Sequence, residues 1–185
     1  MKHFLIISLY LPSLFFGQNA FTDVTLNSGI DNIYDVYEGL FGGGVVAFDY
    51  NNDGFEDLYI TGGKSQDILY KNNGDGTFKD VINGSGLLKD SLMVTTGVSS
   101  ADVNKDGYID LLVTTITSQN NHPNDKNKMS SNLLYINNGD GTFSDLTSKY
   151  GIQKRNFSTS SSFGDINADG YPDLFIANYF KDFYF

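Results

Sequence analysis

The sequence predicts an all-β protein built from β-propeller blades, and three observations support this. Short apolar runs rich in β-branched and aromatic residues recur along the chain, each shorter than a typical core helix. Asn-Gly and Asp-Gly steps, which are strong hairpin-turn signals, occur at 73–76 and 138–141. A unit of about 50–60 residues is repeated, which is the size of one four-stranded blade. We therefore expect about two and a half four-stranded antiparallel blades.

The N-terminus has the pattern of a secretion signal. Lys2 and His3 precede an apolar run of about 13 residues, from Phe4 to Phe16, which is shorter than the ~20 residues of a membrane span. We expect residues 1–17 to be a signal peptide, with residue 20 as the latest position for the cleavage. The mature chain, from residue 18 to 185, is then secreted, or held at the cell surface or in the periplasm. The alternative is a buried first strand or helix.

Composition excludes several classes of function. The 185 residues carry a net charge of −10, with 12 basic side chains and no basic cluster, so nucleic-acid binding is not expected. There is no cysteine, which excludes disulfides, thiol catalysis and cysteine-ligated metal centres. The two histidines are His3 and His122. No run beyond the N-terminus reaches membrane length, so no membrane span is expected in the mature chain.

An acidic loop occurs three times with the pattern D-x-N-x-D-G-[FY]-x-D-L, beginning at Asp49, Asp102 and Asp165. Positions 1, 3, 5 and 9 carry oxygen ligands, and the glycine at position 6 permits a turn that points the carbonyl of position 7 inward. This is the opening geometry of a calcium loop. It is not an EF-hand, because position 12 is apolar in all three copies and not the bidentate Glu of that motif.

We therefore expect about three Ca²⁺ sites, one in each loop. Calcium is favoured over magnesium because a protein cage of five oxygens, one of them a carbonyl, suits the larger ion. The alternative is that Asp and Asn form Asx turns in polar loops. The expected ligands are Asp49, Asn51, Asp53, the Phe55 carbonyl and Asp57 in loop one; Asp102, Asn104, Asp106, the Tyr108 carbonyl and Asp110 in loop two; and Asp165, Asn167, Asp169, the Tyr171 carbonyl and Asp173 in loop three.

Two further elements complete the repeat and place its strands. A Leu-Tyr-x-Asn-Asn-Gly-Asp-Gly-Thr-Phe hairpin ends at Phe78 and again at Phe143. Each hairpin runs into the pattern F-x-D-[VL]-[TI]-x-x-x-G-[IL], which also occurs at Phe21–Ile30, where we expect a strand. The units span about 21–77, 78–142 and 143–185, and the insertion at 118–130 is expected to be a solvated loop. Further strands are expected at 45–48, 58–61, 111–115 and 174–177.

These units resemble FG-GAP-like (VCBS) repeats, and the stretch Phe163–Leu174 carries the closest local match. The cadence of Phe21–Thr25, Gly42–Asp49 and the hairpin is similar to the cartilage acidic protein class, whose members often carry a C-terminal ASPIC/UnbV domain that nothing here matches. The resemblance covers about residues 21–178. It implies a seven-bladed propeller of the integrin-alpha type, with calcium loops on the blades and a role as an extracellular interaction scaffold.

The third unit lacks its own hairpin, so we expect the chain to be a fragment of a seven-bladed propeller. The favoured function is a non-catalytic, calcium-binding adhesion or interaction scaffold with a protein or glycan ligand. The alternatives are the propeller part of a polysaccharide-processing enzyme, and a calcium-dependent lectin-like glycan binder. No enzyme is expected, because His122 lies in the solvated insertion and Glu38 and Glu56 share no motif.

Overall fold

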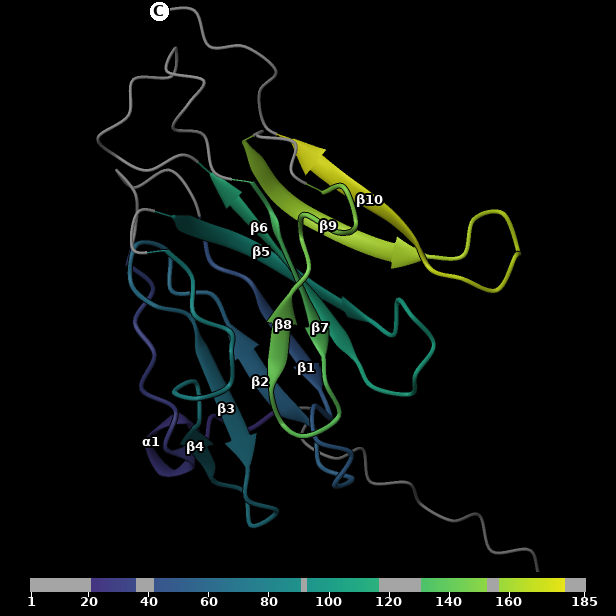
Figure 1. Cartoon of the computed structure of the whole chain (residues 1–185). Coiled ribbons are helices and arrows are strands. Elements are labelled where there is room, and N and C mark those ends of the chain that lie inside the picture. Colours follow the sequence, from purple (N-terminus) through teal and green to yellow (C-terminus); the bar gives the residue numbers. More distant parts are fainter. Residues whose placement is uncertain (1–20, 36–41, 91–92, 117–130, 153–156, 179–185) are drawn as a thin grey trace, which may run out of the picture.

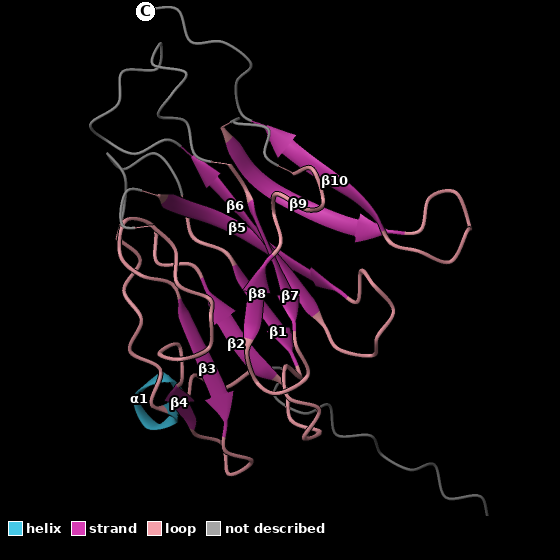
Figure 2. Ribbon diagram, viewed as in Figure 1, coloured by secondary structure: helices cyan, strands magenta, loops and turns pink. Residues whose placement is uncertain are grey.

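The computed structural model describes residues 21–35, 42–90, 93–116, 131–152 and 157–178 of the chain. Within these ranges it contains three antiparallel sheets and one short helix (Figures 1 and 2). The first sheet has the order β1-β2-β3-β4, the second β5-β6-β7-β8, and the third pairs β9 with β10. The strands are β1 (Val45–Phe48), β2 (Asp57–Ile60), β3 (Ile68–Asn72), β4 (Phe78–Asp80), β5 (Val94–Ala101), β6 (Asp110–Ile116), β7 (Leu133–Asn137), β8 (Phe143–Asp145), β9 (Ser158–Gly164) and β10 (Asp173–Asn178).

Consecutive strands are neighbours in every sheet, so each sheet is a simple meander, as expected of a propeller blade. The expected strands at 45–48, 58–61, 111–115 and 174–177 correspond to β1, β2, β6 and β10, which confirms the all-β fold class. The sheets are offset from the sequence units, because β4 and β8 each begin a repeat in the sequence yet close the preceding sheet. Among the described residues, no helix is long and apolar enough to cross a membrane.

The sheets pack face to face around two apolar cores, and β6 contributes to both. Leu111 lies in the core between the first two sheets, together with Tyr59 and Leu69. Leu112 faces the opposite way, into the core against Leu174 of the third sheet. Successive side chains of a strand point to opposite faces, so a strand with another sheet packed on each face is buried on both sides. This explains why all seven residues of β6 are buried.

Neighbouring sheets approach each other closely at glycines in or beside the first strands of the first two sheets. A Cβ on Gly44, just before β1, would lie 2.9 Å from the Thr96 carbonyl oxygen of β5, and a Cβ on Gly97 would lie 2.7 Å from the Thr159 carbonyl oxygen of β9. The hydroxyl of Thr61 donates to the Thr96 carbonyl, which ties the first sheet to the second. The absence of a side chain at these glycines therefore sets the spacing between blades.

The expectation of a strand at Phe21–Ile30 is wrong. This segment contains a four-residue helix, α1 (Thr25–Ser28), which lies beside β4 (Figure 1). The Asp23 carboxylate accepts the Thr25 N–H, and Gly29 ends the turn with a φ of 76°. These are local hydrogen bonds that compete with strand pairing. In the other two copies only the first three residues of the pattern, β4 and β8, pair as strands.

The two Asn-Asn-Gly-Asp-Gly-Thr-Phe segments form hairpins as expected. The Asn73 N–H donates to the Thr77 carbonyl, and the Asp75 carboxylate accepts both the N–H and the hydroxyl of Thr77. The second copy repeats these contacts. The tyrosines that precede the hairpins, Tyr70 and Tyr135, are buried in the blades and are not available for stacking on a sugar.

Candidate metal loops

The three acidic loops each join the first two strands of a sheet and share one backbone conformation. They run from β1 to β2, from β5 to β6 and from β9 to β10. Position 6 is a glycine with φ between 85° and 89° in all three copies, as the turn requires. Position 4 also has a positive φ, at Asn52, Lys105 and Ala168. Lysine and alanine rarely adopt this conformation, so the loop itself imposes it, and the sequence did not reveal it.

The carboxylate of position 1 and the amide oxygen of position 3 lie side by side in each loop. In loop one, the Asp49 and Asn51 side-chain oxygens both accept the N–H of Asp53, each at 3.1 Å. The second oxygen of Asp49 accepts the Gly54 N–H at 2.7 Å. The Asp53 carboxylate in turn accepts the Phe55 N–H at 3.1 Å. Three of the expected ligands therefore accept hydrogen bonds from backbone N–H groups of one turn.

Loops two and three repeat this arrangement. Asp102 and Asn104 share the N–H of Asp106, each at 3.1 Å, and Asp165 and Asn167 share that of Asp169 at 3.1 and 2.8 Å. The remaining bonds also recur: position 1 accepts the N–H of position 6, and position 5 accepts that of position 7, in both loops. Hard oxygen donors at these positions are the chemistry that calcium prefers.

The carboxylate of position 9 is built differently, because it ties the loop to the sheet. Asp110 is fully buried, and its two oxygens accept the N–H groups of Val103 in the loop and Asn137 on β7. Asp57 makes the equivalent bonds to Tyr50 and Asn72. Asp173 is half-buried and accepts the N–H of Ile166. Position 9 therefore has a structural role that the ligand assignment alone did not anticipate.

Burial raises the pKa of Asp110 to about 6, and the nearby charges of Asp106 and Asp102 add to this effect, while the two N–H bonds oppose it. Burial raises the pKa of Asp57 as well. Each shift shows that an uncompensated negative charge at position 9 is unfavourable, a condition that a cation in the loop would relieve. In the part of the chain that the structure describes, no three acidic or histidine side chains form a preassembled metal-binding group, so the ligand assignment stays a prediction.

The loops lie in a row along one edge of the blades. The Asn52 side chain at position 4 of loop one donates to the Gly107 carbonyl of loop two at 3.3 Å. The Lys105 ammonium, at position 4 of loop two, lies 3.9 Å from the centre of the Tyr171 ring in loop three. The aromatic rings at position 7 of loops one and two, Phe55 and Tyr108, pack on the glycines of the neighbouring hairpins. Adjacent loops are thus in contact with each other.

A lysine lies against loop one and was not anticipated. The Lys71 ammonium of β3 is 3.0 Å from the Asp53 carboxylate, and this hydrogen bond lowers the pKa of Asp53 and raises that of Lys71. Loop one therefore already pairs one of the three carboxylates at its ligand positions with a positive charge. The pairing depends on the antiparallel fold of the first sheet, which brings β3 next to the loop, so sequence spacing alone could not have identified it.

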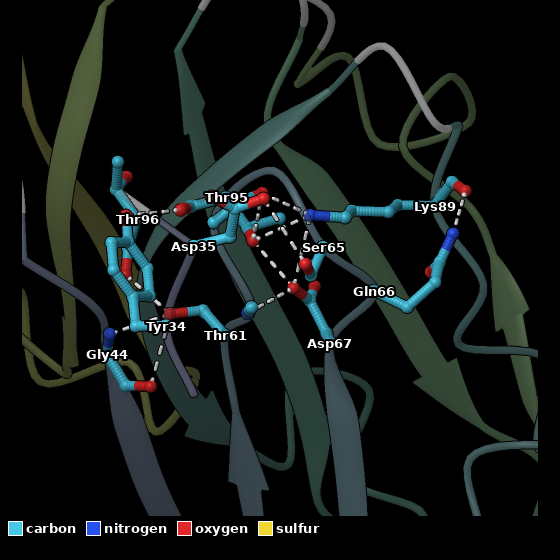
Figure 3. A network of polar contacts seen from close by, with 12 residues as sticks. Tyr34, Asp35, Gly44, Thr61, Ser65, Gln66, Asp67, Lys89, Thr95 and Thr96 are labelled. Carbon is cyan, nitrogen blue, oxygen red and sulfur yellow. Dashed lines mark hydrogen bonds and ion pairs between the residues drawn. The ribbon is translucent and has the colours of Figure 1, made fainter. Parts of the chain in front are cut away.

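A second charged cluster, also unanticipated, is buried between the first two sheets (Figure 3). The Lys89 ammonium donates to the Gly63 carbonyl and to the Thr95 hydroxyl, and it lies 3.4 Å from the Asp67 carboxylate. Asp67 also accepts bonds from Tyr59, Gly62 and Thr95. No buried side-chain nitrogen or oxygen in the described residues lacks a partner, which is the condition for a structural network.

Of the three candidates for catalysis, only Glu56 lies within the described residues. Glu56 is exposed at position 8 of loop one, where its backbone carbonyl accepts a bond from the Asn72 side chain. Glu38 and His122 lie outside the described residues, as do the expected signal peptide and the whole 118–130 insertion.

Comparison with known proteins supports the conclusion that the chain is built from repeats. A protein-family model described as FG-GAP-like repeat matches residues 49–113 and 116–176, which is more than half of the sequence. The matched segments include all three acidic loops. No curated protein matches the chain at a significant level.

Proposed function

The chain belongs to the FG-GAP-like repeat family, and from this premise we propose that it is an exported, calcium-binding interaction scaffold without catalytic activity. Its propeller-type sheets supply a rigid framework, and its loops supply the exposed surface. Exposed loops on a rigid framework are the usual place for binding functions. The proposed ligand is a protein or a glycan, and the proposed role is adhesion or another extracellular interaction.

One observation carries the calcium part of the proposal, which is that the same arrangement of oxygens occurs in three loops. In each loop, the carboxylate of position 1 and the amide oxygen of position 3 accept the same N–H, and a second carboxylate follows at position 5. An acidic turn with an unrelated role would not need Asp or Asn at the same four positions in all three loops. The ligands we propose are those expected from the sequence, with position 9 serving both the ion and the sheet.

Direct calcium titration of the purified mature chain tests this proposal. Binding stabilises a folded protein by RT ln(1 + [L]/Kd), about 2.7 kcal/mol for each site at 100 Kd. The affinity we expect is that of extracellular modules, on the order of 10⁻⁴–10⁻³ M. Thermal melts in EDTA and in several millimolar Ca²⁺ should therefore differ clearly. Identical melts, together with no heat of binding, would show that the loops are not calcium sites.

The export and interaction parts of the proposal need separate tests. N-terminal sequencing of secreted protein should give a start near Gln18 or Phe21, and a soluble folded product that retains Met1 would contradict export. Screens of the protein on glycan and extracellular-protein arrays, with and without calcium, address the ligand. Turnover of a polysaccharide would instead identify the chain as part of an enzyme, and calcium-dependent capture on glycans alone would identify it as a lectin.

A further inference from the structure

Loop one differs from the other two loops because a basic side chain from the same blade contacts it. The Lys71 ammonium lies 3.0 Å from Oδ2 of Asp53, and both side chains are partly exposed, at 39% and 31%. The same oxygen of Asp53 also accepts the amide of Asn51 at 3.0 Å. Asp53 therefore has a positive partner that is part of the fold.

The corresponding position of the second blade has no charge. The repeat aligns Lys71, between Tyr70 and Asn72, with Ile136, between Tyr135 and Asn137. Ile136 is buried in the core against the third sheet. Among the described residues, no basic side chain pairs with a carboxylate of loop two or loop three. Lys105 belongs to loop two, but its ammonium contacts the Tyr171 ring.

This difference changes what each loop requires in order to hold its shape. Loops with three carboxylates are strained by the repulsion of like charges unless a cation lies near them. In loop one the Lys71 ammonium supplies part of that positive charge. A divalent cation that binds loop one must displace this ammonium from Asp53 or bind beside it. Both are unfavourable, and calcium binding to loop two involves neither.

We propose that Lys71 acts as an internal counter-ion for loop one, so that this loop keeps its shape without metal and binds calcium more weakly than loop two. This inference rests on the proposed calcium function of the loops. It assigns the first two repeats unequal roles, with loop one less dependent on calcium than loop two. Removing the lysine should therefore make loop one resemble loop two.

The experiment isolates loop one in the full-length mature chain. Asp106→Asn and Asp169→Asn together weaken loops two and three, and calcium chloride is then titrated calorimetrically into this background. Adding Lys71→Met should tighten the remaining calcium constant by about two- to fivefold at low ionic strength, because exposed charge pairs have modest, salt-sensitive strength. The gain should shrink in high salt. Circular dichroism verifies that each variant is folded.

Lys79→Met is the matched control. Lys79 is the antiparallel partner of Lys71 on β4, it is exposed, and it makes no ion pair with loop one in the described structure. The Lys79→Met substitution removes the same charge from the neighbouring strand, and it should change the calcium constant less than twofold. Equal effects of the two lysine variants, or no effect of Lys71→Met, would overturn the counter-ion role while leaving the calcium function intact. Absence of calcium binding in the unmodified chain would instead contradict both.

Discussion

The ammonium of Lys89 and the carboxylate of Asp67 lie 3.4 Å apart, and neither side chain is exposed to solvent. Lys89 lies in the connection between β4 and β5, whereas Asp67 immediately precedes β3, so the pair joins the first two sheets. Thr95 of β5 donates to Asp67 and accepts from Lys89. The blade interface is therefore held by a charged network in addition to the apolar core (Figure 3).

Lys89→Met should destabilise the chain by about 3 kcal/mol, because it leaves the Asp67 carboxylate buried without its positive partner. The double variant Lys89→Met with Asp67→Asn should lose less than the sum of the two single variants, since no unpaired charge remains. Urea unfolding of the four proteins measures both quantities. The surface variant Lys79→Met serves as control and should stay within about 0.5 kcal/mol of the parent. Additive single effects would show that the two groups are not coupled.

The same pair predicts a pH dependence on the alkaline side. Burial lowers the pKa of Lys89 below its usual value, although Asp67 opposes the shift. The folded protein then releases this proton at a lower pH than the unfolded chain, so within that window the unfolded state holds more protons. The free energy of unfolding therefore gains a contribution that increases as pH increases toward the ordinary lysine pKa.

To isolate this contribution, unfolding is compared between the parent and the uncharged double variant at neutral pH and at about pH 9.5. The difference in unfolding free energy, parent minus double variant, should grow at the higher pH. Tyrosine titration contributes little to this difference, because burial, the largest cause of the raised pKa of Tyr59 and Tyr135, is kept in both proteins and holds these tyrosines protonated at this pH. A difference that shrinks would mean that Lys89 has a raised pKa in the folded state.

How far the sequence predicts the molecule depends on whether an interaction is local. The strands, the hairpins and the position-6 glycine of each loop follow from periodicity and from turn chemistry within about ten residues. The contacts of Lys71 with Asp53 and of Lys89 with Asp67 join residues about 20 positions apart, and each depends on how strands are paired. The expected strand at Phe21–Ile30 is wrong for the opposite reason. Local hydrogen bonds form the helix Thr25–Ser28 there, although the repeat pattern predicted a strand.

Three equivalent glycines separate backbone strain from steric fit. Gly29, Gly86 and Gly151 all have φ between 71° and 83°, so alanine at each costs about 1 kcal/mol in strain. A Cβ on Gly86 would lie 2.1 Å from the Phe143 carbonyl oxygen, and one on Gly29 would lie 2.9 Å from that of Phe78. Within the described part of the chain, a Cβ on Gly151 meets nothing within 4 Å.

Alanine variants at these three positions should therefore destabilise in a fixed order. Gly151→Ala should show the strain alone, and Gly86→Ala should cost about 1–3 kcal/mol more because the Phe143 backbone must move. Gly29→Ala should fall between them. Thermal unfolding of the three variants in one buffer measures the order. Equal losses of stability would mean that Gly86 and Gly29 do not contact the backbone at the end of the next hairpin.

Asp106 and Asp110 belong to one loop, but we expect the loss of stability on their removal to depend differently on calcium. Asp106 is exposed and makes short-range bonds within the loop, whereas Asp110 is buried and accepts N–H bonds from Val103 and Asn137. Asp110→Ala leaves two backbone donors without their acceptor, so it should cost about 2–4 kcal/mol even in EDTA. Relief of the buried charge offsets part of this cost.

Asp106→Ala should change little in EDTA, and its apo form should gain slightly from reduced repulsion. Its loss should emerge only with calcium present, as a smaller calcium-induced rise in melting temperature than in the parent. Melts of both variants in EDTA and in millimolar Ca²⁺, with calorimetric stoichiometry, distinguish the two roles. If Asp106→Ala keeps the full stoichiometry of the parent, position 5 is not a ligand. If it destabilises equally in EDTA, Asp106 acts through the fold, as Asp110 does, and not through the ion.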